Sequence, residues 1–300
     1  MAPKVVAVVL SWNGRRWIQR CLDSLSATAY PALGIHVVDN GSRDGTPEEI
    51  AARFPHVLLT RQRRNLGFAE GNNAGIRAAL RAGADYVALL NQDTWVEPGW
   101  LTPLIEVAEA DPGIGILSPA QLSYEGDTYD PNFEKIVHGY PGGPVIDVPT
   151  VTGAALLVRR KVFEQVGLLD PIYFAYFEEV DFCRRARIRG WRTAVVPAAR
   201  IHHWHGLLHP AEMPLHIKIL ALRNQFVLGL KDPEASTWAN LRHCLALWRR
   251  EVGYCLRHPR GLRGGAARAA ALAWVAVWLL VNLPRVLYHR ALERRRGAYL

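Results

Sequence analysis

Polar side chains that could bind a ligand follow two apolar runs in the first third of the chain. They are Asp39, Asn40, Asn91, Gln92 and Asp93. The runs that precede them, Ile35–Val38 and Tyr86–Leu90, have the length and composition of buried strands. Because neighbouring strand ends of one sheet lie close together, the carboxylates of Asp39 and Asp93 are predicted to meet at one crevice. The alternative is that each aspartate only caps the turn or helix that follows it.

Another acidic group lies farther along the chain. Glu178, Glu179 and Asp181 stand at the start of a predicted helix that ends near Arg189. Gly190 is well placed to end this helix, because glycine accepts a left-handed conformation. The helix dipole stabilises carboxylates in a first turn by ~0.3–1 kcal/mol each, which could alone explain the group. The other interpretation is general acid–base chemistry.

The order of the predicted elements is what would bring these side chains together. Strands are predicted at Val5–Leu10, Ile35–Val38, Val57–Leu59, Tyr86–Leu90 and Val151–Val158, and helices at Trp17–Leu25, Pro47–Arg53, Ala69–Ala82 and Lys161–Val166. This alternation predicts an α/β fold with a mostly parallel sheet flanked by helices. Ligands bind such sheets at the carboxyl ends of the strands. The stretch Ser123–Pro149 is predicted to be a long irregular loop.

Composition excludes several classes of protein. With 50% hydrophobic and 21% charged residues in 300, the chain can bury a full core and is neither disordered nor collagen-like. Its four cysteines have no metal-site or disulfide-framework spacing, and only four residues precede the first apolar run, so a reducing cytosol is expected.

Seven short motifs occur in a fixed order along the chain. They are LSWN at 10–13, VDNGSRDGT at 38–46, NLGFAEGNNAG at 65–75, LLNQDT at 89–94, TGAA at 152–155, FEEVDFC at 177–183 and RIRGWR at 187–192. This set resembles the family 2 glycosyltransferases of the GT-A fold, and most closely their bacterial rhamnosyltransferase-like branch. The similarity runs from about Val5 to Gly206, roughly two-thirds of the chain.

The resemblance implies an inverting transfer of a sugar from a nucleotide diphosphate donor to a hydroxyl of a glycan or lipid-linked acceptor. The sugar would be rhamnose or a related hexose, with dTDP-rhamnose favoured as the donor, in the synthesis of cell-wall or surface polysaccharide. The glycines form neither a dinucleotide fingerprint nor a P-loop. A catalytically inactive nucleotide-sugar-binding or scaffold protein at the membrane is the alternative.

A divalent cation, Mg²⁺ or Mn²⁺, is the cofactor that the resemblance implies. Asp93 matches the family's metal-binding carboxylate, although Asn91 replaces the first acidic residue of the usual Asp-x-Asp. His202 is the candidate imidazole ligand, with His203 and His205 as competitors. In a strand His203 would face opposite to the other two. These histidines could also be satisfied core or interface residues.

The remaining candidate residues would bind the donor or take a proton. Those matched to donor binding are Trp12, Asp39, Asn65, Gly67, Gly71, Asn72, Asn91, Gln92, Asp93 and Gly153. Trp12 would cover the base, and the glycines would let backbone approach the donor because they lack Cβ. Asn65 and Asn72 could instead anchor the loop. Glu179 matches the catalytic base, with Glu178 as the fallback, and Asp181 is expected to pair with Arg184 or Arg185.

Charge divides the chain. Residues 240–300 hold 12 Arg and two acidic residues, whereas residues 1–239 hold 24 basic and 25 acidic ones. We therefore expect a catalytic domain at 1–212, with a nucleotide-sugar-binding half at 1–120 and an acceptor and base half at 121–212, and a basic helical extension at 213–300. The asymmetry favours an anionic partner.

The extension contains a run without charge, Ala269–Pro284, which at ~1.5 Å per residue is shorter than a ~30 Å hydrocarbon core. A shallow anchor on an anionic membrane surface is predicted, which places the protein in the cytoplasm at the inner face of the plasma membrane. The alternative is a helix buried against the catalytic domain or in a homodimer. Nucleic-acid binding is not expected, since no aromatic and basic residues interleave as in single-strand platforms.

Overall fold

The computed structural model describes residues 1–204, 214–257 and 265–294. The chain divides into two compact units. The first comprises Met1–Phe174, Glu178–His205 and Tyr299–Leu300, and the second comprises Ala175–Phe177 and Gly206–Ala298. The boundary predicted between residues 212 and 213 lies outside the described residues, as does His205.

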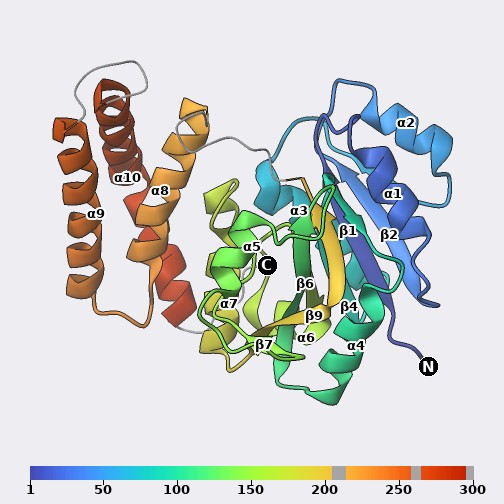
Figure 1. Ribbon diagram of the computed structural model, residues 1–300. Coiled ribbons are helices and arrows are strands. Elements are labelled where there is room, and N and C mark those ends of the chain that lie inside the picture. The colour runs from blue at the N-terminus through green and yellow to red at the C-terminus, as the bar shows by residue number, and fades with distance from the viewer. Residues whose placement is uncertain (205–213, 258–264, 295–300) are drawn as a thin grey trace. The chain divides into compact units, whose positions relative to one another are not determined.

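The first unit is built on a mixed nine-stranded sheet (Figure 1). Its strands are β1 (Val5–Ser11), β2 (Leu33–Asp39), β3 (Leu58–Arg61), β4 (Tyr86–Asn91), β5 (Thr94–Val96), β6 (Ile114–Ser123), β7 (Ile146–Asp147), β8 (Ala155–Arg159) and β9 (Arg192–His203). The order is β3-β2-β1-β4-β8-β6-β9-β5, with β7 paired to β9. The first four strands are parallel, whereas β8 is antiparallel to both of its neighbours. The predicted α/β class is confirmed; β6 and β9 are also parallel to each other, whereas β5 and β7 are antiparallel to β9.

Helices cover both faces of this sheet. They are α1 (Ile18–Ser26), α2 (Thr46–Arg53), α3 (Gly67–Arg81), α4 (Leu101–Ala110), α5 (Pro131–Val137), α6 (Arg160–Val166) and α7 (Glu178–Ile188). Along β1, Val5, Ala7 and Val9 pack with α1, α2 and α4, and Val6 and Val8 pack with α3, α6 and α7. An unbroken apolar strand is required here because neither face meets water.

The stretch Ser123–Pro149 is not wholly irregular, which corrects the prediction. It contains α5 and β7. Asp130 caps α5, because its Oδ1 accepts hydrogen bonds from the backbone N–H of Asn132 at 2.8 Å and of Phe133 at 3.2 Å. Pro131 follows at the first helical position, and Phe133 is buried. The Asp-Pro signal was present in the sequence, but the helix is too short to show an apolar period.

The second unit consists of helices α8 (Leu215–Lys231), α9 (Thr237–Arg257) and α10 (Gly265–Arg294). Leu222 and Phe226 of α8 form an apolar cluster with Leu272 and Val275 of α10, and Trp248 of α9 packs against it. α10 continues through Pro284, although a proline ring disfavours a helix interior.

Candidate active site

Asp39 ends β2 at the carboxyl edge of the parallel strands. Its backbone lies in register with Ser11 of β1 and Arg61 of β3. The carboxylate is 2% exposed, and its Oδ2 accepts a hydrogen bond from the backbone N–H of Ser42 at 3.2 Å. Among the described residues its Oδ1 has no hydrogen-bond partner although it is buried. The turn after β2 therefore uses only the Oδ2 of Asp39, and Oδ1 is left as a hydrogen-bond acceptor at the edge of the sheet.

Trp12 follows β1 at the same edge, and its side chain is 50% exposed. Its backbone is held by Gln92, whose Oε1 accepts from Trp12 N–H at 2.9 Å and whose Nε2 donates to Trp12 O at 3.1 Å. The hydroxyl of Ser11 also donates to Gln92 Oε1 at 2.8 Å. Gln92 thus ties the end of β1 to the end of β4 and leaves the indole accessible.

The loop before α3 is held by asparagines. Asn65 Oδ1 accepts from the backbone N–H of Gly67 at 2.8 Å and from Asn40 Nδ2 at 3.0 Å, so Asn65 anchors this loop. Asn72 Nδ2 donates to the carbonyl oxygen of Phe68 at 3.0 Å. Within the described part of the chain, Asn72 Oδ1 is buried without a hydrogen-bond partner. The anchoring role is displayed at Asn65, whereas the hydrogen bond of Asn72 joins two residues of α3.

Gly67 and Gly71 are explained by close packing. Gly67 has φ +85°, and a Cβ there would lie 2.5 Å from Cδ2 of Phe174. The carbonyl oxygen of Phe174 also accepts from the backbone N–H of Ala69 at 3.2 Å. A Cβ on Gly71 would lie 2.5 Å from Cδ1 of Leu10, so glycine lets α3 approach β1. Direct approach of these glycines to a donor remains a prediction.

Replacing Gly67 by alanine should destabilise the protein. The left-handed backbone costs a residue with Cβ about 1–2 kcal/mol, and overpacking against Phe174 adds about 1–3 kcal/mol. Gly83→Ala is the matched control, because Gly83 has φ +81° but a Cβ there meets nothing within 4 Å. Urea unfolding should show a lower midpoint for Gly67→Ala than for Gly83→Ala. Equal midpoints would show that contact with Phe174 is unimportant.

Asp93 lies between β4 and β5, where the sequence predicted it. Its carbonyl oxygen accepts from the backbone N–H of Trp204 at 2.9 Å, and its Oδ1 lies 3.7 Å from Nε2 of His203. The pairing of Thr94 with His203 in the β5–β9 ladder brings these side chains together. The other ring nitrogen of His203, Nδ1, lies 3.1 Å from Oδ2 of Asp130.

His202 is engaged elsewhere. Its ring stacks on Trp95 with centroids 3.7 Å apart and an interplanar angle of 3°. Its Nδ1 lies 2.9 Å from the carbonyl oxygen of Ser123, and its Nε2 lies 3.3 Å from Oε1 of Glu97. The structure brings His203, and not the predicted His202, to Asp93, because neighbouring residues of a strand point to opposite faces.

Few protein side chains near Asp93 could serve as metal ligands. No group of three or more His, Cys, Asp or Glu side chains that could hold a metal ion occurs within residues 1–204, 214–257 and 265–294. Asp93 and His203 form a pair of one carboxylate and one imidazole, which Mg²⁺ and Mn²⁺ accept among oxygen ligands. Such a pair fits a divalent cation whose other ligands come from a bound diphosphate and water.

The acidic residues at the start of α7 have distinct surroundings. Glu178 is 3% exposed, and burial, followed by the charge of Glu179, raises its pKa well above the usual value. Its Oε2 finds no hydrogen-bond partner among the residues that the structure describes. Glu179 is only half-buried. Burial therefore favours the protonated form of Glu178, while Glu179 is the less buried of the two residues although its Oε2 is also buried.

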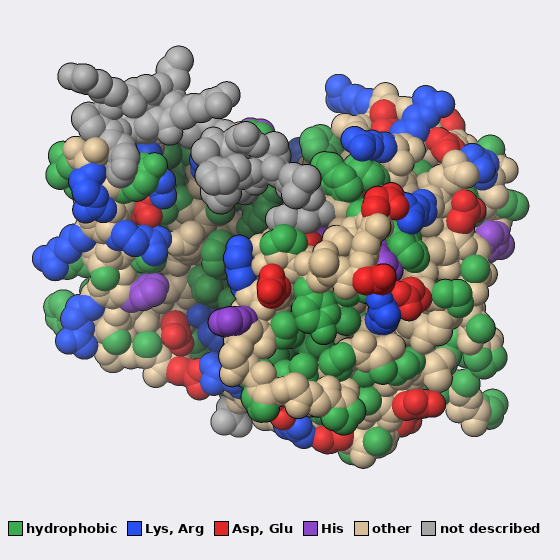
Figure 2. Space-filling model, in the orientation of Figure 1, with side chains coloured by type: hydrophobic (Ala, Val, Ile, Leu, Met, Phe, Trp, Pro, Cys, Tyr) green, Lys and Arg blue, Asp and Glu red, His purple; other side chains and the backbone are tan. Residues whose placement is uncertain are grey.

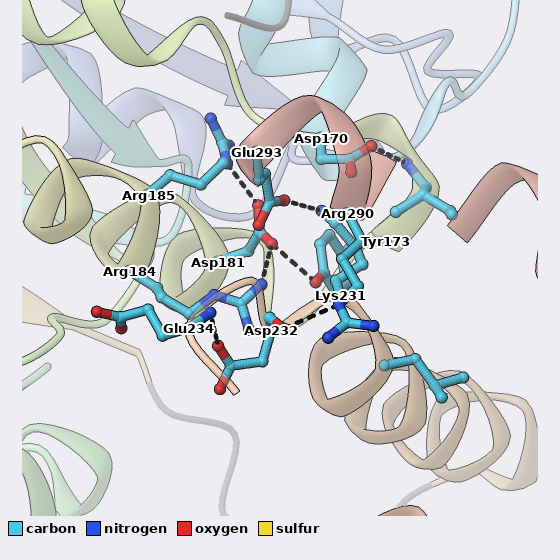
Figure 3. A network of polar contacts seen from close by, with 12 residues as sticks. Asp170, Tyr173, Asp181, Arg184, Arg185, Lys231, Asp232, Glu234, Arg290 and Glu293 are labelled. Atoms are coloured by element: carbon cyan, nitrogen blue, oxygen red, sulfur yellow. Dashed lines mark hydrogen bonds and ion pairs between the residues drawn. The ribbon is translucent and has the colours of Figure 1, made fainter. Parts of the chain in front are cut away.

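Asp181 has a structural role, as predicted (Figure 3). Its Oδ2 accepts from Nε of Arg185 at 2.8 Å, and its Oδ1 accepts from the hydroxyl of Tyr173 at 3.0 Å. Arg184 donates to the same Oδ1 at 3.1 Å. Arg185 also donates to the carbonyl oxygens of Val166 and Leu168. This network fixes the first turn of α7 and, with it, the backbone of Glu178 and Glu179.

Three aromatic residues just before α7 were missed by the sequence analysis. Phe174, Tyr176 and Phe177 have φ of +63°, +70° and +74°. Bulky residues rarely adopt this region, and such strain concentrates at functional sites. No residue type in the sequence announces it, because glycine or asparagine would be expected at these angles.

Gly153 connects the two groups of candidate residues. A Cβ on Gly153 would lie 4.0 Å from Oε1 of Glu178 and 3.6 Å from Cζ of Phe68. The next residue, Ala154, accepts a hydrogen bond at its carbonyl oxygen from the backbone N–H of Asn91 at 2.9 Å. The start of α7 and the strand end that carries Asp93 are thus linked through two consecutive residues.

Comparisons with known proteins agree with this architecture. Residues 6–167 match the family model described as Glycosyl transferase family 2. The N-acetylglucosaminyl-diphospho-decaprenol L-rhamnosyltransferase of Mycobacterium tuberculosis is 29% identical over 235 residues, which cover 68% of this chain and 76% of that protein.

Two solved structures resemble this one in fold. A mannosyltransferase from Pyrobaculum calidifontis in complex with GDP-Man and Mn²⁺ gives a TM-score of 0.58 at 18% identity, covering 99% of this chain and 84% of that one. TarS 1–349 of S. aureus in complex with UDP-GlcNAc gives 0.61 at 15% identity, covering 98% and 89%. At these identities the likeness shows a shared fold.

Proposed function

Since this chain belongs to glycosyl transferase family 2, we propose that it moves rhamnose or a related hexose from a nucleotide diphosphate donor to a hydroxyl acceptor, with inversion at the anomeric carbon. It is a glycosyltransferase. The name of the Mycobacterium tuberculosis relative supports rhamnose as the sugar and a diphospho-lipid-linked glycan as acceptor, and the motif resemblance favours dTDP-rhamnose as donor. The product would then serve cell-wall or surface polysaccharide synthesis.

The donor would bind at the carboxyl ends of β1 and β2. The unused Oδ1 of Asp39 would accept a hydrogen bond from the base or ribose, and the exposed indole of Trp12 would cover the base. The buried Oδ1 of Asn72 offers a further acceptor within α3. A buried polar atom without a partner costs free energy, which a bound donor would recover.

Asp93 and His203 would hold a divalent cation at the donor diphosphate. When bound, the cation stabilises the negative charge that builds on the leaving group. Glu179 would take the proton of the acceptor hydroxyl as the new bond forms, since it lies beside Glu178 at the start of α7 and is the less buried of the two. Burial favours the protonated form of Glu178, which would make Glu178 the poorer proton acceptor of the two.

One observation supports this assignment above the others. Gly153 adjoins Glu178, the neighbour of Glu179 in α7, while Ala154 binds the backbone of Asn91, two residues before Asp93, which supports placing the start of α7 and the end of β4 at one site. The test is to incubate the protein with dTDP-rhamnose, Mn²⁺ and a diphospho-lipid-linked N-acetylglucosamine, and to detect the disaccharide by mass spectrometry. A panel of other nucleotide sugars identifies a different donor. Donor binding without transfer or hydrolysis of any donor would support an inactive binding protein instead.

The choice of imidazole can be checked directly. His203→Ala should weaken Mn²⁺-dependent donor binding by ~10–100-fold, because it removes a side chain next to Asp93. His202→Ala is the matched control, and it should keep Mn²⁺ dependence while losing stability with its Trp95 stacking. Calorimetric titration of donor with and without Mn²⁺ measures both. The reverse pattern would return the role to His202.

The acceptor of the relative also bears on location. Since that acceptor is lipid-linked by name, we propose that residues 240–300 hold this protein peripherally on the inner face of the plasma membrane. The 12 arginines against two acidic residues in this segment support attraction to anionic lipid.

A further inference from the structure

One face of α10 is apolar and exposed. Val277, Leu280 and Val281 are 61%, 75% and 74% exposed, and Trp274 and Tyr288 are exposed on the same side. Residues 274, 277, 281 and 288 recur at intervals of three, four and seven, which places them along one face of a helix. The opposite face is buried through Ala271, Leu272, Val275 and Val286. We call the exposed set, Trp274, Val277, Leu280, Val281 and Tyr288, the α10 stripe.

The described surface of α9 and α10 is cationic. Exposed arginines on α9 and α10 are Arg242, Arg249, Arg250, Arg257, Arg285 and Arg294. The carboxylates between Thr237 and Arg294 are Glu251 and Glu293, and both are buried in ion pairs. Figure 2 shows Lys and Arg side chains gathered over α9. The described surface of these two helices therefore presents positive charge and no exposed carboxylate.

Both ends of α10 are fixed to the other helices of its unit. Near its C-terminus, Glu293 pairs with Lys231 of α8 at 3.0 Å, and both side chains are buried (Figure 3). Arg290 donates to Thr237 Oγ1 at 3.1 Å and to the carbonyl oxygen of Ala235 at 2.8 Å. Near its N-terminus, Arg268 pairs with Glu251 of α9 at 2.6 Å. Breaking the Lys231–Glu293 pair would leave buried charge uncompensated.

These contacts decide how α10 can meet a bilayer. Arg268–Arg294 is a helix of 27 residues with a mean hydropathy of 1.8, long and apolar enough to cross a membrane by length and composition alone. Crossing would require either breaking the pairs at both ends or carrying α9, with exposed Arg242 and Arg249, into hydrocarbon. Charged side chains in the hydrocarbon core are strongly disfavoured.

We propose that α10 lies in the plane of an anionic lipid surface, with the α10 stripe at the boundary between headgroups and acyl chains, and does not cross the bilayer. This specifies the membrane contact of the proposed function and rests on it. Apolar side chains with basic neighbours are what an interfacial helix requires. A second copy of the chain would bring like charges together, and a nucleic acid would leave the apolar side chains uncovered.

The test uses the full chain and sealed vesicles of phosphatidylcholine with or without phosphatidylglycerol. Val277→Asn/Leu280→Asn/Val281→Asn removes apolar surface without changing charge, and should lower the partition coefficient on anionic vesicles by at least about 100-fold. The matched control is Ala51→Asn/Ala52→Asn/Leu58→Asn, three exposed apolar residues of the catalytic unit, which should bind like the wild type. Circular dichroism checks that both variants fold.

Three results would overturn the proposal. The first is that the stripe variant binds anionic vesicles as well as the wild type does. The second is that trypsin added outside the vesicles fails to cleave at the C-terminal arginines of bound protein. The third is that the wild type forms a dimer in solution without vesicles and the stripe variant does not. Trypsin should cleave after Arg294–Arg296 on bound protein, because both ends of an in-plane helix stay outside. Hydrolysis of donor without vesicles should be the same in the stripe variant and the wild type. Loss of hydrolysis in the wild type itself would count against the proposed function instead.

Discussion

Glu179→Gln is expected to reduce transfer turnover by about 10²–10⁴-fold, because the amide cannot take the proton of the acceptor hydroxyl. Donor affinity should change little, since the proton moves only as the acceptor bond forms. Stopped assays of sugar transfer give kcat, and calorimetry with Mn²⁺ gives the dissociation constant of the donor. Wild-type kcat in this variant would remove Glu179 from the role of base.

Glu178→Gln is the matched control for that experiment. Burial raises the pKa of Glu178 and so favours its protonated form, which glutamine imitates in shape and charge. Turnover should therefore persist. Ionisation of Glu178 is easier in the unfolded chain, so it lowers folding stability once the pH exceeds about 4.5, the ordinary value. Glu178→Gln should accordingly raise the melting temperature at pH 7 but not at pH 3, and loss of turnover would transfer the role of base to Glu178.

Asp93→Ala should abolish the dependence of donor binding on Mn²⁺. Removing a residue that is hydrogen-bonded to a metal ligand typically lowers metal affinity by ~10–100-fold. Removing the carboxylate ligand itself is expected to lower metal affinity by more than this. Calorimetric titrations of donor with Mn²⁺ and with a chelator provide the comparison.

Asp127→Ala is the control for Asp93→Ala, because it removes an exposed carboxylate paired with Arg200 and changes the net charge equally. It should retain the wild-type difference between the two titrations. If Asp93→Ala retained that difference as well, the cation would have to be held elsewhere.

The elements of the catalytic unit could be predicted because their sequence signals are local. Val5–Ser11 is unbroken and apolar since both faces are covered, and the glycine that ends α7 has the left-handed φ of +86°. The pairing of Asp181 with Arg185 followed from helical spacing of four residues. The short helix α5 escaped prediction because seven residues show little apolar periodicity.

The site depended more on contacts between distant segments. Asn65 and Gln92 could be placed at strand ends from sequence, yet their hydrogen bonds to Asn40 and to Trp12 required the sheet register. The choice between His202 and His203 depended on which side of β9 faces Asp93. A one-residue shift in a strand reverses that side, so the pattern alone left both open.

By itself the sequence determined the α/β class, the family motifs, the two candidate carboxylates and the charge difference between the parts of the chain. Each depends on residue type and on spacing within one segment. The tertiary structure decided which imidazole meets Asp93, which glutamate at the start of α7 is buried, and which face of α10 is exposed. These depend on burial and on partners far away in the chain, which only the packed chain establishes.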